Sequence, residues 1–183
     1  HIPAAEIVAH RVIWSVPIAG LILVIMGRTA DLRAALLNPR MLGMGALTAS
    51  IISLNWGIYV WAISSGHTLD AALGYYINPL FSIALGAVFL GERPSRLQMF
   101  AIALAIAAVV VLTVSTGKVP WVAIGLFVSW GFYALCKKQL PVGPNQGFLL
   151  EVLILLLPAM GFVTWLLINQ KSHFIILSWY DTG

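Results

Sequence analysis

The feature that most constrains the fold of this chain is a series of six apolar stretches, each of about 20 residues, the length at which a helix crosses a bilayer. The stretches are residues 7–26, 41–63, 71–90, 97–115, 119–136 and 148–168. Their hydrophobicity is continuous, whereas the strands of an outer-membrane barrel are about ten residues long and alternate polar with apolar side chains. The sequence therefore predicts an all-α, polytopic bundle of about six transmembrane helices.

Charged residues are too few to cover a soluble domain. They make up 9% of the 183 residues, and 61% are hydrophobic, whereas a soluble domain carries about 25% charged residues. The same apolar content excludes an intrinsically disordered chain. The net charge is +4, but the basic residues form no cluster, so we expect no nucleic-acid partner. The predicted surroundings are a lipid bilayer.

The basic residues of the loops predict how the chain is oriented. Loops 27–40, 91–96 and 137–147 hold seven Lys or Arg residues, while the alternate side holds only Lys118 and Lys171. Cytoplasmic loops carry the positive excess, so these three loops are predicted to be cytoplasmic and the start of the chain to lie outside. A first span that runs inward needs an earlier span or a signal, so at least one helix is expected upstream.

Three polar residues near the start of the first span form one candidate site. Glu6 and His10 are four residues apart and share a helical face, whereas Arg11 is turned about 100° from His10. Charged groups inside membrane spans are candidate functional residues. These side chains are predicted to line the outer mouth of a polar cavity. The alternative is that His10 and Arg11 extend to the outer headgroups.

The third span holds polar residues near the middle of the membrane. Pro79 cannot donate a hydrogen bond to the Tyr75 carbonyl four residues earlier, so that carbonyl needs a donor from protein or cavity water. Tyr75, Asn78 and Ser82 share one helical face. A kinked helix with polar groups at mid-membrane is typical of transporter binding sites, although prolines and buried asparagines also occur in plain helix packing.

The second span offers a further polar pair, Asn55 and Tyr59, one turn apart. Asn55 is either a contact between helices or a ligand contact. The small residues Ala49, Ser53 and Gly57 recur every four positions, which predicts a close approach of a neighbouring helix.

Glu151 is the candidate proton carrier. With the last span starting at residue 148, we expect Glu151 in the first helical turn, where the helix dipole favours a carboxylate. The alternative is a buried acid that faces the bundle and carries a coupling proton.

Signatures of enzymes and metal sites are missing from the sequence. It contains no Walker A loop, HExxH, GxSxG or acidic cluster with metal-ligand spacing. The single cysteine, Cys136, excludes a disulfide framework within the chain. We therefore expect no catalytic residue, no metal site and no cofactor, and the missing nucleotide loop argues against an ATP-driven pump.

Four segments carry a family resemblance. They are AEIVAHRVIWS (5–15), LNWGIYVWAI (54–63), LDAALGYYINPLFSIALGAVFLGERPSRLQ (69–98) and SWGFYALCKK (129–138). These segments closely resemble the RarD branch of the EamA-type drug/metabolite transporter superfamily. The third segment is the strongest match because it is both long and ordered.

The resemblance implies a bundle of ten transmembrane helices in a bacterial inner membrane, built from two five-helix repeats of inverted topology. This chain then corresponds to a fragment with helices two to seven, in a single transmembrane domain. Residues 1–118 are the rest of the first repeat, and residues 119–183 are the start of the second. Family motifs include the positions of Glu6, His10, Arg11, Asn55, Tyr75, Asn78, Pro79 and Glu151, which favours a role in a central cavity. Glu92 and Arg93 are expected to close a helix on the cytoplasmic side.

Sequence and resemblance together predict a secondary transporter of small organic solutes that works by alternating access, with Pro79 allowing a gate to bend. Two alternatives remain open. One is a membrane-embedded enzyme that acts on lipid and uses His10 with Glu6 as a general base. The other is a scaffold subunit in which Tyr75 and Asn78 pack in a dry helix interface. Neither the transported solute nor the oligomeric state is specified by these residues.

Overall fold

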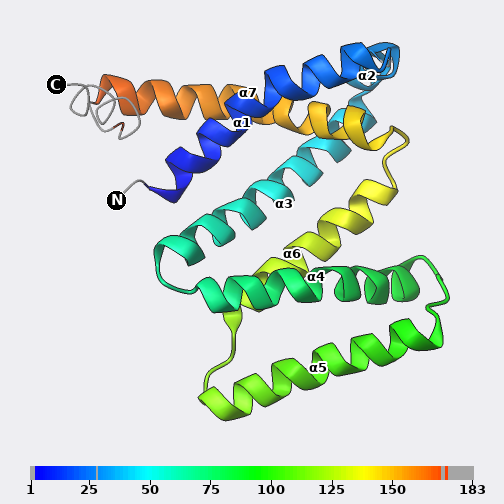
Figure 1. Cartoon of the computed structure of the whole chain (residues 1–183). Helices are drawn as coiled ribbons and strands as arrows, with labels where there is room; N and C mark the ends of the chain where they lie inside the picture. Colours follow the sequence, from blue (N-terminus) through cyan, green and yellow to red (C-terminus); the bar gives the residue numbers. More distant parts are fainter. Residues whose placement is uncertain (1–2, 28, 170–171, 173–183) are drawn as a thin grey trace. The chain divides into compact units, whose positions relative to one another are not determined.

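The computed structural model describes residues 3–27, 29–169 and 172 (Figure 1). Within this part of the chain the backbone forms seven helices and no strand, which confirms the all-α prediction. The helices are α1 (Ala4–Ile25), α2 (Thr29–Leu37), α3 (Pro39–Ser64), α4 (Thr68–Phe89), α5 (Arg96–Thr116), α6 (Trp121–Lys138) and α7 (Pro144–Ile168).

Five of the described helices, α1, α3, α4, α5 and α7, are long and apolar enough to cross a membrane. They coincide with five of the six predicted spans. The sixth prediction, residues 119–136, lies in α6, which is helical but has only 18 residues and ends on Lys137 and Lys138. These two lysines lower the hydropathy of α6, which is not among the five helices that are apolar enough to cross a membrane.

The predicted loop 27–40 contains a short helix, α2, that the hydropathy pattern did not indicate. Its nine residues are too few to cross a bilayer, so a search for membrane spans passes over it. Asn38 separates α2 from α3, and its Oδ1 accepts hydrogen bonds from the backbone N–H groups of Arg40 and Met41 at 3.0 and 3.3 Å. This is the capping interaction that starts a new helix.

The chain forms two compact units. Unit 1 comprises the described residues of His1–Ala49 and Leu140–Gly183, and unit 2 is Ser50–Gln139. Helix α3 contributes its first part to unit 1 and its second part to unit 2.

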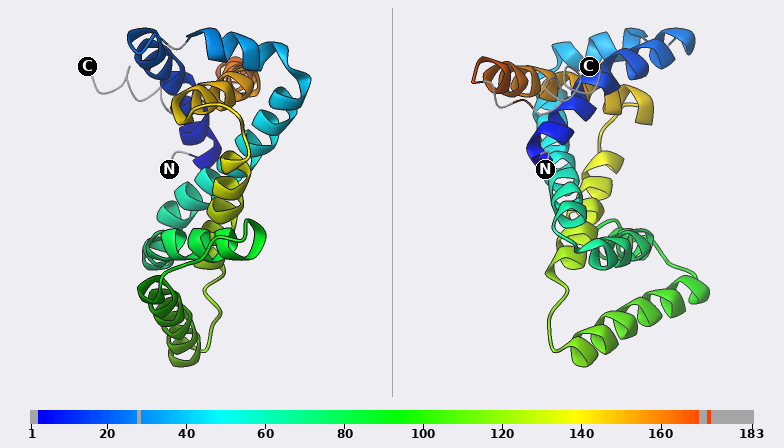
Figure 2. Two further views of the ribbon diagram at one scale, coloured as in Figure 1. Left: turned by 90° about the vertical axis from the view of Figure 1, so that its right-hand side faces the viewer. Right: turned by 60° about the vertical axis from the view of Figure 1, so that its left-hand side comes forward.

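In unit 1, α1 packs against α7 (Figures 1 and 2). The core of this pair consists of Ala19, Leu23, Leu149 and Val152. The last turn of α1 meets the first turn of α7, because Asn145 Nδ2 lies 3.0 Å from the sulfur of Met26. The two helices therefore run in opposite directions.

Helix α2 covers α7 on a second side. Ala35 of α2 shares a buried cluster with Leu140 and Leu150. The start of α3 also approaches α7 closely, since a Cβ at Gly45 would lie 2.8 Å from a methyl group of Leu150.

In unit 2, the main contact is between α4 and α6, and Ala62 of α3 joins the buried cluster formed with Ala71 of α4 and Leu126 of α6. Gly74 allows this close approach, because a Cβ there would lie 2.9 Å from Leu126 Cβ and 3.1 Å from the Ala123 carbonyl oxygen. Gly57 has no described atom within 4 Å of such a Cβ, so in unit 2 the close approach lies at Gly74 of α4 and not at Gly57 of α3.

Helix α5 contains no buried residue and packs only loosely on α4 (Figure 2). The loop before it is ordered by Glu92, whose backbone N–H donates to the Gly86 carbonyl at 3.2 Å. The Glu92 carboxylate accepts a hydrogen bond from Lys138 Nζ at 2.8 Å. Glu92 thus closes α4 as expected and joins its end to the end of α6.

Candidate functional site

Asn55 is fully buried between α3 and α6. Its Nδ2 donates to the Leu126 carbonyl and to Ser129 Oγ, both at 2.9 Å. A backbone carbonyl can only accept, so this contact fixes which end of the carboxamide faces α6. The Asn55 Oδ1 is buried and has no hydrogen-bond partner among the described residues. Asn55 is therefore a contact between helices that also presents an unused acceptor.

Ser129 is a member of this polar group that the sequence pattern did not indicate. Its hydroxyl donates to the Gly125 carbonyl at 2.6 Å and accepts from Asn55. In the sequence, Ser129 stands out only as a small polar residue within an apolar span. This does not predict that its hydrogen-bond partner is Asn55, 74 positions earlier.

Tyr59 and Tyr75 define how α3 and α4 face each other. Their rings meet edge to face, with centroids 5.0 Å apart and planes at 77°. Asn55 lies about one helical turn before Tyr59 on α3, and Asn78 lies about one turn after Tyr75 on α4. The ring contact therefore lies one turn from each asparagine along its own helix.

Asn78 is 4% exposed, and its Oδ1 is buried without a hydrogen-bond partner among the described residues. Its backbone carbonyl accepts from Ser82 Oγ at 2.8 Å. Helix α4 continues through Pro79 as a single element, and the Pro79 ring is exposed. The Tyr75 side chain is 39% exposed. Of the predicted mid-membrane residues, Asn55 and Asn78 are therefore the buried pair.

Glu6 lies inside α1, because this helix begins at Ala4 rather than at residue 7. It is fully buried, and its Oε1 accepts a hydrogen bond from Ser172 Oγ at 3.0 Å. His10, one turn further, is half-buried, and Arg11 is exposed. Glu6 is thus the most enclosed member of the three-residue group.

Glu151 does not lie in the first turn of α7, so this expectation is wrong. The helix begins at Pro144, a residue suited to a first turn, which places Glu151 about two turns inside it. Only 1% of Glu151 is exposed. The helix dipole acts at the first turn, so it does not explain why a carboxylate is present at Glu151. The position agrees with the alternative, a buried acid.

The predicted residues divide between the two units. Unit 2 holds Asn55, Tyr75, Asn78 and Pro79, whereas unit 1 holds Glu6, His10, Arg11 and Glu151. Within the described residues, no group of three His, Cys, Asp or Glu side chains could hold a metal ion.

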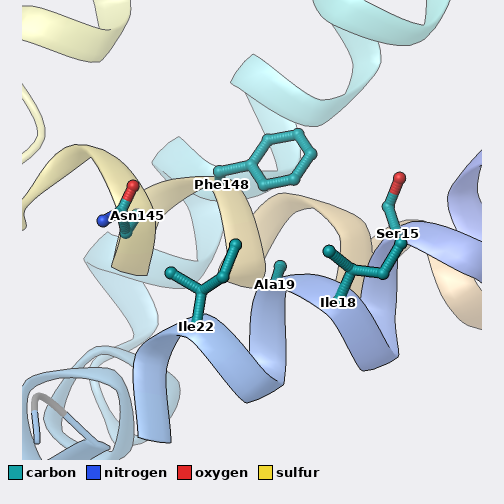
Figure 3. A pocket seen from close by; sticks show the side chains of 6 residues that line it. All are labelled: Ser15, Ile18, Ala19, Ile22, Asn145 and Phe148. Atoms are coloured by element: carbon teal, nitrogen blue, oxygen red, sulfur yellow. The ribbon is translucent and has the colours of Figure 1, made fainter. Parts of the chain in front are cut away.

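A cavity between α1 and α7 is lined by other residues (Figure 3). Ser15, Ile18, Ala19 and Ile22 of α1 face Asn145 and Phe148 of α7 there. Its volume of about 140 Å³ is below the 300–1,000 Å³ typical of small-molecule sites. This cavity is therefore not the candidate site.

Comparisons with known proteins agree with this helical architecture. Residues 1–114 match the EamA-like transporter family. Protein RarD of Streptomyces exfoliatus is 45% identical over 93% of this chain and 54% of its own length. An uncharacterized transporter of Vibrio cholerae is 39% identical over 97% of this chain and 59% of its own. Protein RarD of Escherichia coli strain K12 is 38% identical over 94% and 58%.

The chain therefore spans a little over half the length of these curated relatives. No solved structure gives a significant match to it.

Proposed function

The chain belongs to the EamA-like transporter family, and from this premise we propose that it acts in a secondary transporter of small organic solutes in the bacterial inner membrane. Its family and its five apolar helices make it a multi-pass membrane protein of the drug/metabolite transporter type. Relatives that bear the name transporter support a transport role.

The observation that carries the proposal is the pair of buried acceptors on α3 and α4. The Oδ1 atoms of Asn55 and Asn78 both lack a hydrogen-bond donor in the described structure. Leaving such a group buried and unsatisfied costs about 1–3 kcal/mol, and lipid tails offer no donor. A solute that donates hydrogen bonds would satisfy both atoms, so these residues are proposed to contact it.

Alternating access around Asn55 and Asn78 is the proposed mechanism. Pro79 follows Asn78 directly and interrupts the hydrogen-bond ladder of α4. A bend at Pro79 would move one end of α4 and Tyr75 with it. We place the gate there.

Glu6, His10 and Arg11 are proposed to line the outer mouth of the pathway, and Glu151 to carry a coupling proton. The burial of Glu151 two turns inside α7 supports this role, because intramembrane acids are typical of proton relays.

The loops of each unit support the predicted orientation. In unit 1, the segment before α3 packs with the start of α7 through Ala35 and Leu140. In unit 2, Glu92 after α4 binds Lys138 at the end of α6. Both groupings combine loops that the charge count assigns to the cytoplasm, so we propose that loops 27–40, 91–96 and 137–147 lie there and that the chain start lies outside.

The proposed division into repeats places residues 1–118 in the first and 119–183 in the second, within a ten-helix protein. A family match that ends at residue 114 supports this boundary. The opposite directions of α1 and α7, the proposed repeat mates, support the inverted topology.

The scaffold alternative requires Tyr75 and Asn78 in a dry interface, and the 39% exposure of Tyr75 argues against it. The lipid-enzyme alternative gains no support from the relatives' names, of which one describes a transporter and none an enzyme.

Flux through the full-length protein in proteoliposomes tests the proposal. A panel of radiolabelled amines, amides and amphiphilic metabolites is offered in both directions, with and without a pH gradient. We expect protein-dependent flux of at least one hydrogen-bond donor. If none of the panel moves under any gradient, the transporter proposal fails.

A further inference from the structure

Unit 2 contains a pocket of about 520 Å³ where α3 ends, α4 begins and the loop from α5 to α6 passes. Part of its wall is aromatic. The rings of Trp61 and His67 stack with centroids 5.4 Å apart and planes at 17°. The turn between them is closed by the His67 backbone N–H, which donates to the Ala62 carbonyl at 2.8 Å. This wall is therefore held in place by the backbone of the turn.

Two side chains of opposite charge, Asp70 and Lys118, line the same pocket. Neither forms an ion pair or a side-chain hydrogen bond with another residue of the described chain. The backbone at Lys118 is fixed, since its N–H donates to Thr116 Oγ1 at 3.3 Å and its carbonyl accepts from the same hydroxyl at 3.1 Å. A pocket that presents both charges complements a ligand that carries both.

The pocket lies at one end of the helices that surround it, where a spanning helix meets the lipid headgroups. It is built at the ends of α3, α4 and α5, three helices that are long enough to span a membrane. Its rim carries exposed apolar side chains, with Leu69 76%, Trp121 72% and Trp61 49% exposed. Tryptophan is enriched at the membrane–water interface, so an apolar rim beside a charged wall matches the boundary between acyl chains and headgroups.

We propose that this pocket binds the headgroup of a zwitterionic phospholipid with a primary ammonium. Lys118 binds the phosphate. The ammonium donates to the Asp70 carboxylate beside the ring of Trp61, which adds a cation–π contact. The acyl chains lie along Leu69 and Trp121. This site is separate from the buried asparagine pair and does not depend on what the protein transports.

Native mass spectrometry of the full-length protein in detergent tests the proposal. The retained phosphatidylethanolamine and phosphatidylglycerol are compared at matched acyl chains. Phosphatidylglycerol offers the phosphate but no ammonium. We expect the wild type to retain phosphatidylethanolamine more strongly, by about fivefold, the size of one solvent-screened ion pair.

Charge variants test which residue binds the ammonium and which binds the phosphate of the headgroup. Asp70→Asn should remove the preference by weakening phosphatidylethanolamine alone, whereas Lys118→Gln should weaken both lipids. Lys138→Gln, which removes a lysine bound to Glu92 at the other end of unit 2, is the matched control and should change neither. Asp70→Glu keeps the carboxylate and should keep the preference. If Asp70→Asn does not fold, Trp61→Leu tests the ammonium side and should reduce the same preference.

Three results would overturn the proposal. The first is a wild type that retains the two lipids equally. The second is a preference that survives both Asp70→Asn and Trp61→Leu. The third is displacement of the lipid by soluble phosphoethanolamine at equal concentration, which would identify a site for free zwitterions rather than for a phospholipid.

Discussion

The Asn55 carboxamide nitrogen lies 2.9 Å from Ser129 Oγ, and this hydrogen bond joins α3 to α6 between residues 74 positions apart. The same nitrogen also binds the Leu126 carbonyl. Asn55 therefore holds two helices together with its nitrogen while its oxygen stays available to a donor. The nitrogen of Asn55 thus contributes to the packing of unit 2, and its oxygen is proposed to bind the solute.

Removing the Ser129 hydroxyl should weaken the α3–α6 contact modestly. Hydrogen bonds between membrane helices contribute about 0.6 kcal/mol on average and at most about 1.7 kcal/mol, so we expect Ser129→Ala to lower the free energy of unfolding within that range. Unfolding in mixed micelles measures it. Ser115→Ala, whose exposed hydroxyl binds only within its own helix at Leu112, is the control. Equal effects of the two variants would contradict the assigned role of Ser129.

A methyl group at Gly74 should destabilise the protein. The added Cβ would lie 2.9 Å from Leu126 Cβ and close to the backbone of Ala123, and overpacking of this kind costs about 1–3 kcal/mol. Gly57→Ala meets no described atom and should be neutral or stabilising by up to about 1 kcal/mol, because alanine favours helix. Thermal unfolding of both variants checks the difference. A Gly74→Ala protein as stable as Gly57→Ala would show that α4 and α6 are not in close contact.

Opposite ends of unit 2 should be labelled from opposite sides of the membrane. In a Cys136→Ala background, Arg93→Cys is placed in a loop assigned to the cytoplasm, and Val119→Cys in a loop assigned to the outside. A membrane-impermeant maleimide added to intact cells should label Val119→Cys and leave Arg93→Cys unlabelled until the cells are opened. The reverse pattern would invert the proposed orientation.

Glu151 should control the response to a pH gradient. Glu151→Gln keeps the shape of the side chain but cannot release a proton, so stimulation of uptake by an imposed gradient should fall by about tenfold or more. Glu92→Gln removes an exposed carboxylate that is paired with Lys138. An exposed pair contributes about 0–1 kcal/mol, so this control should retain the response. Persistent stimulation in Glu151→Gln would remove Glu151 from the mechanism.

The apolar pattern predicted the helices well, because a helix that crosses a bilayer needs apolar side chains along its whole length. It predicted their ends less well, since hydropathy marks the depth of the membrane rather than the limits of a helix. Pro144, Asn145 and Gln146 are polar or helix-breaking in appearance, yet they form the first turn of α7. That difference moved Glu151 from the end of a helix to its interior.

The candidate site was predicted in part. Asn55 and Asn78 stand out because a carboxamide in an apolar span needs hydrogen-bond partners that lipid does not offer. Both side chains are buried in the structure. The partners could not be predicted. Ser129 meets Asn55, and Ser172 meets Glu6, only through tertiary packing, and no local spacing rule relates residues so far apart in the sequence.

Solute uptake by the full-length wild-type protein and by Asn78→Leu in proteoliposomes tests the central claim most directly. Leucine fills a similar volume but offers no acceptor, so kcat/KM for a hydrogen-bond-donating solute should fall by about tenfold or more. Asn169→Leu, which changes an exposed asparagine at the end of α7, should transport as the wild type does. Uptake by Asn78→Leu equal to that of the wild type would contradict a solute site at the buried asparagine pair.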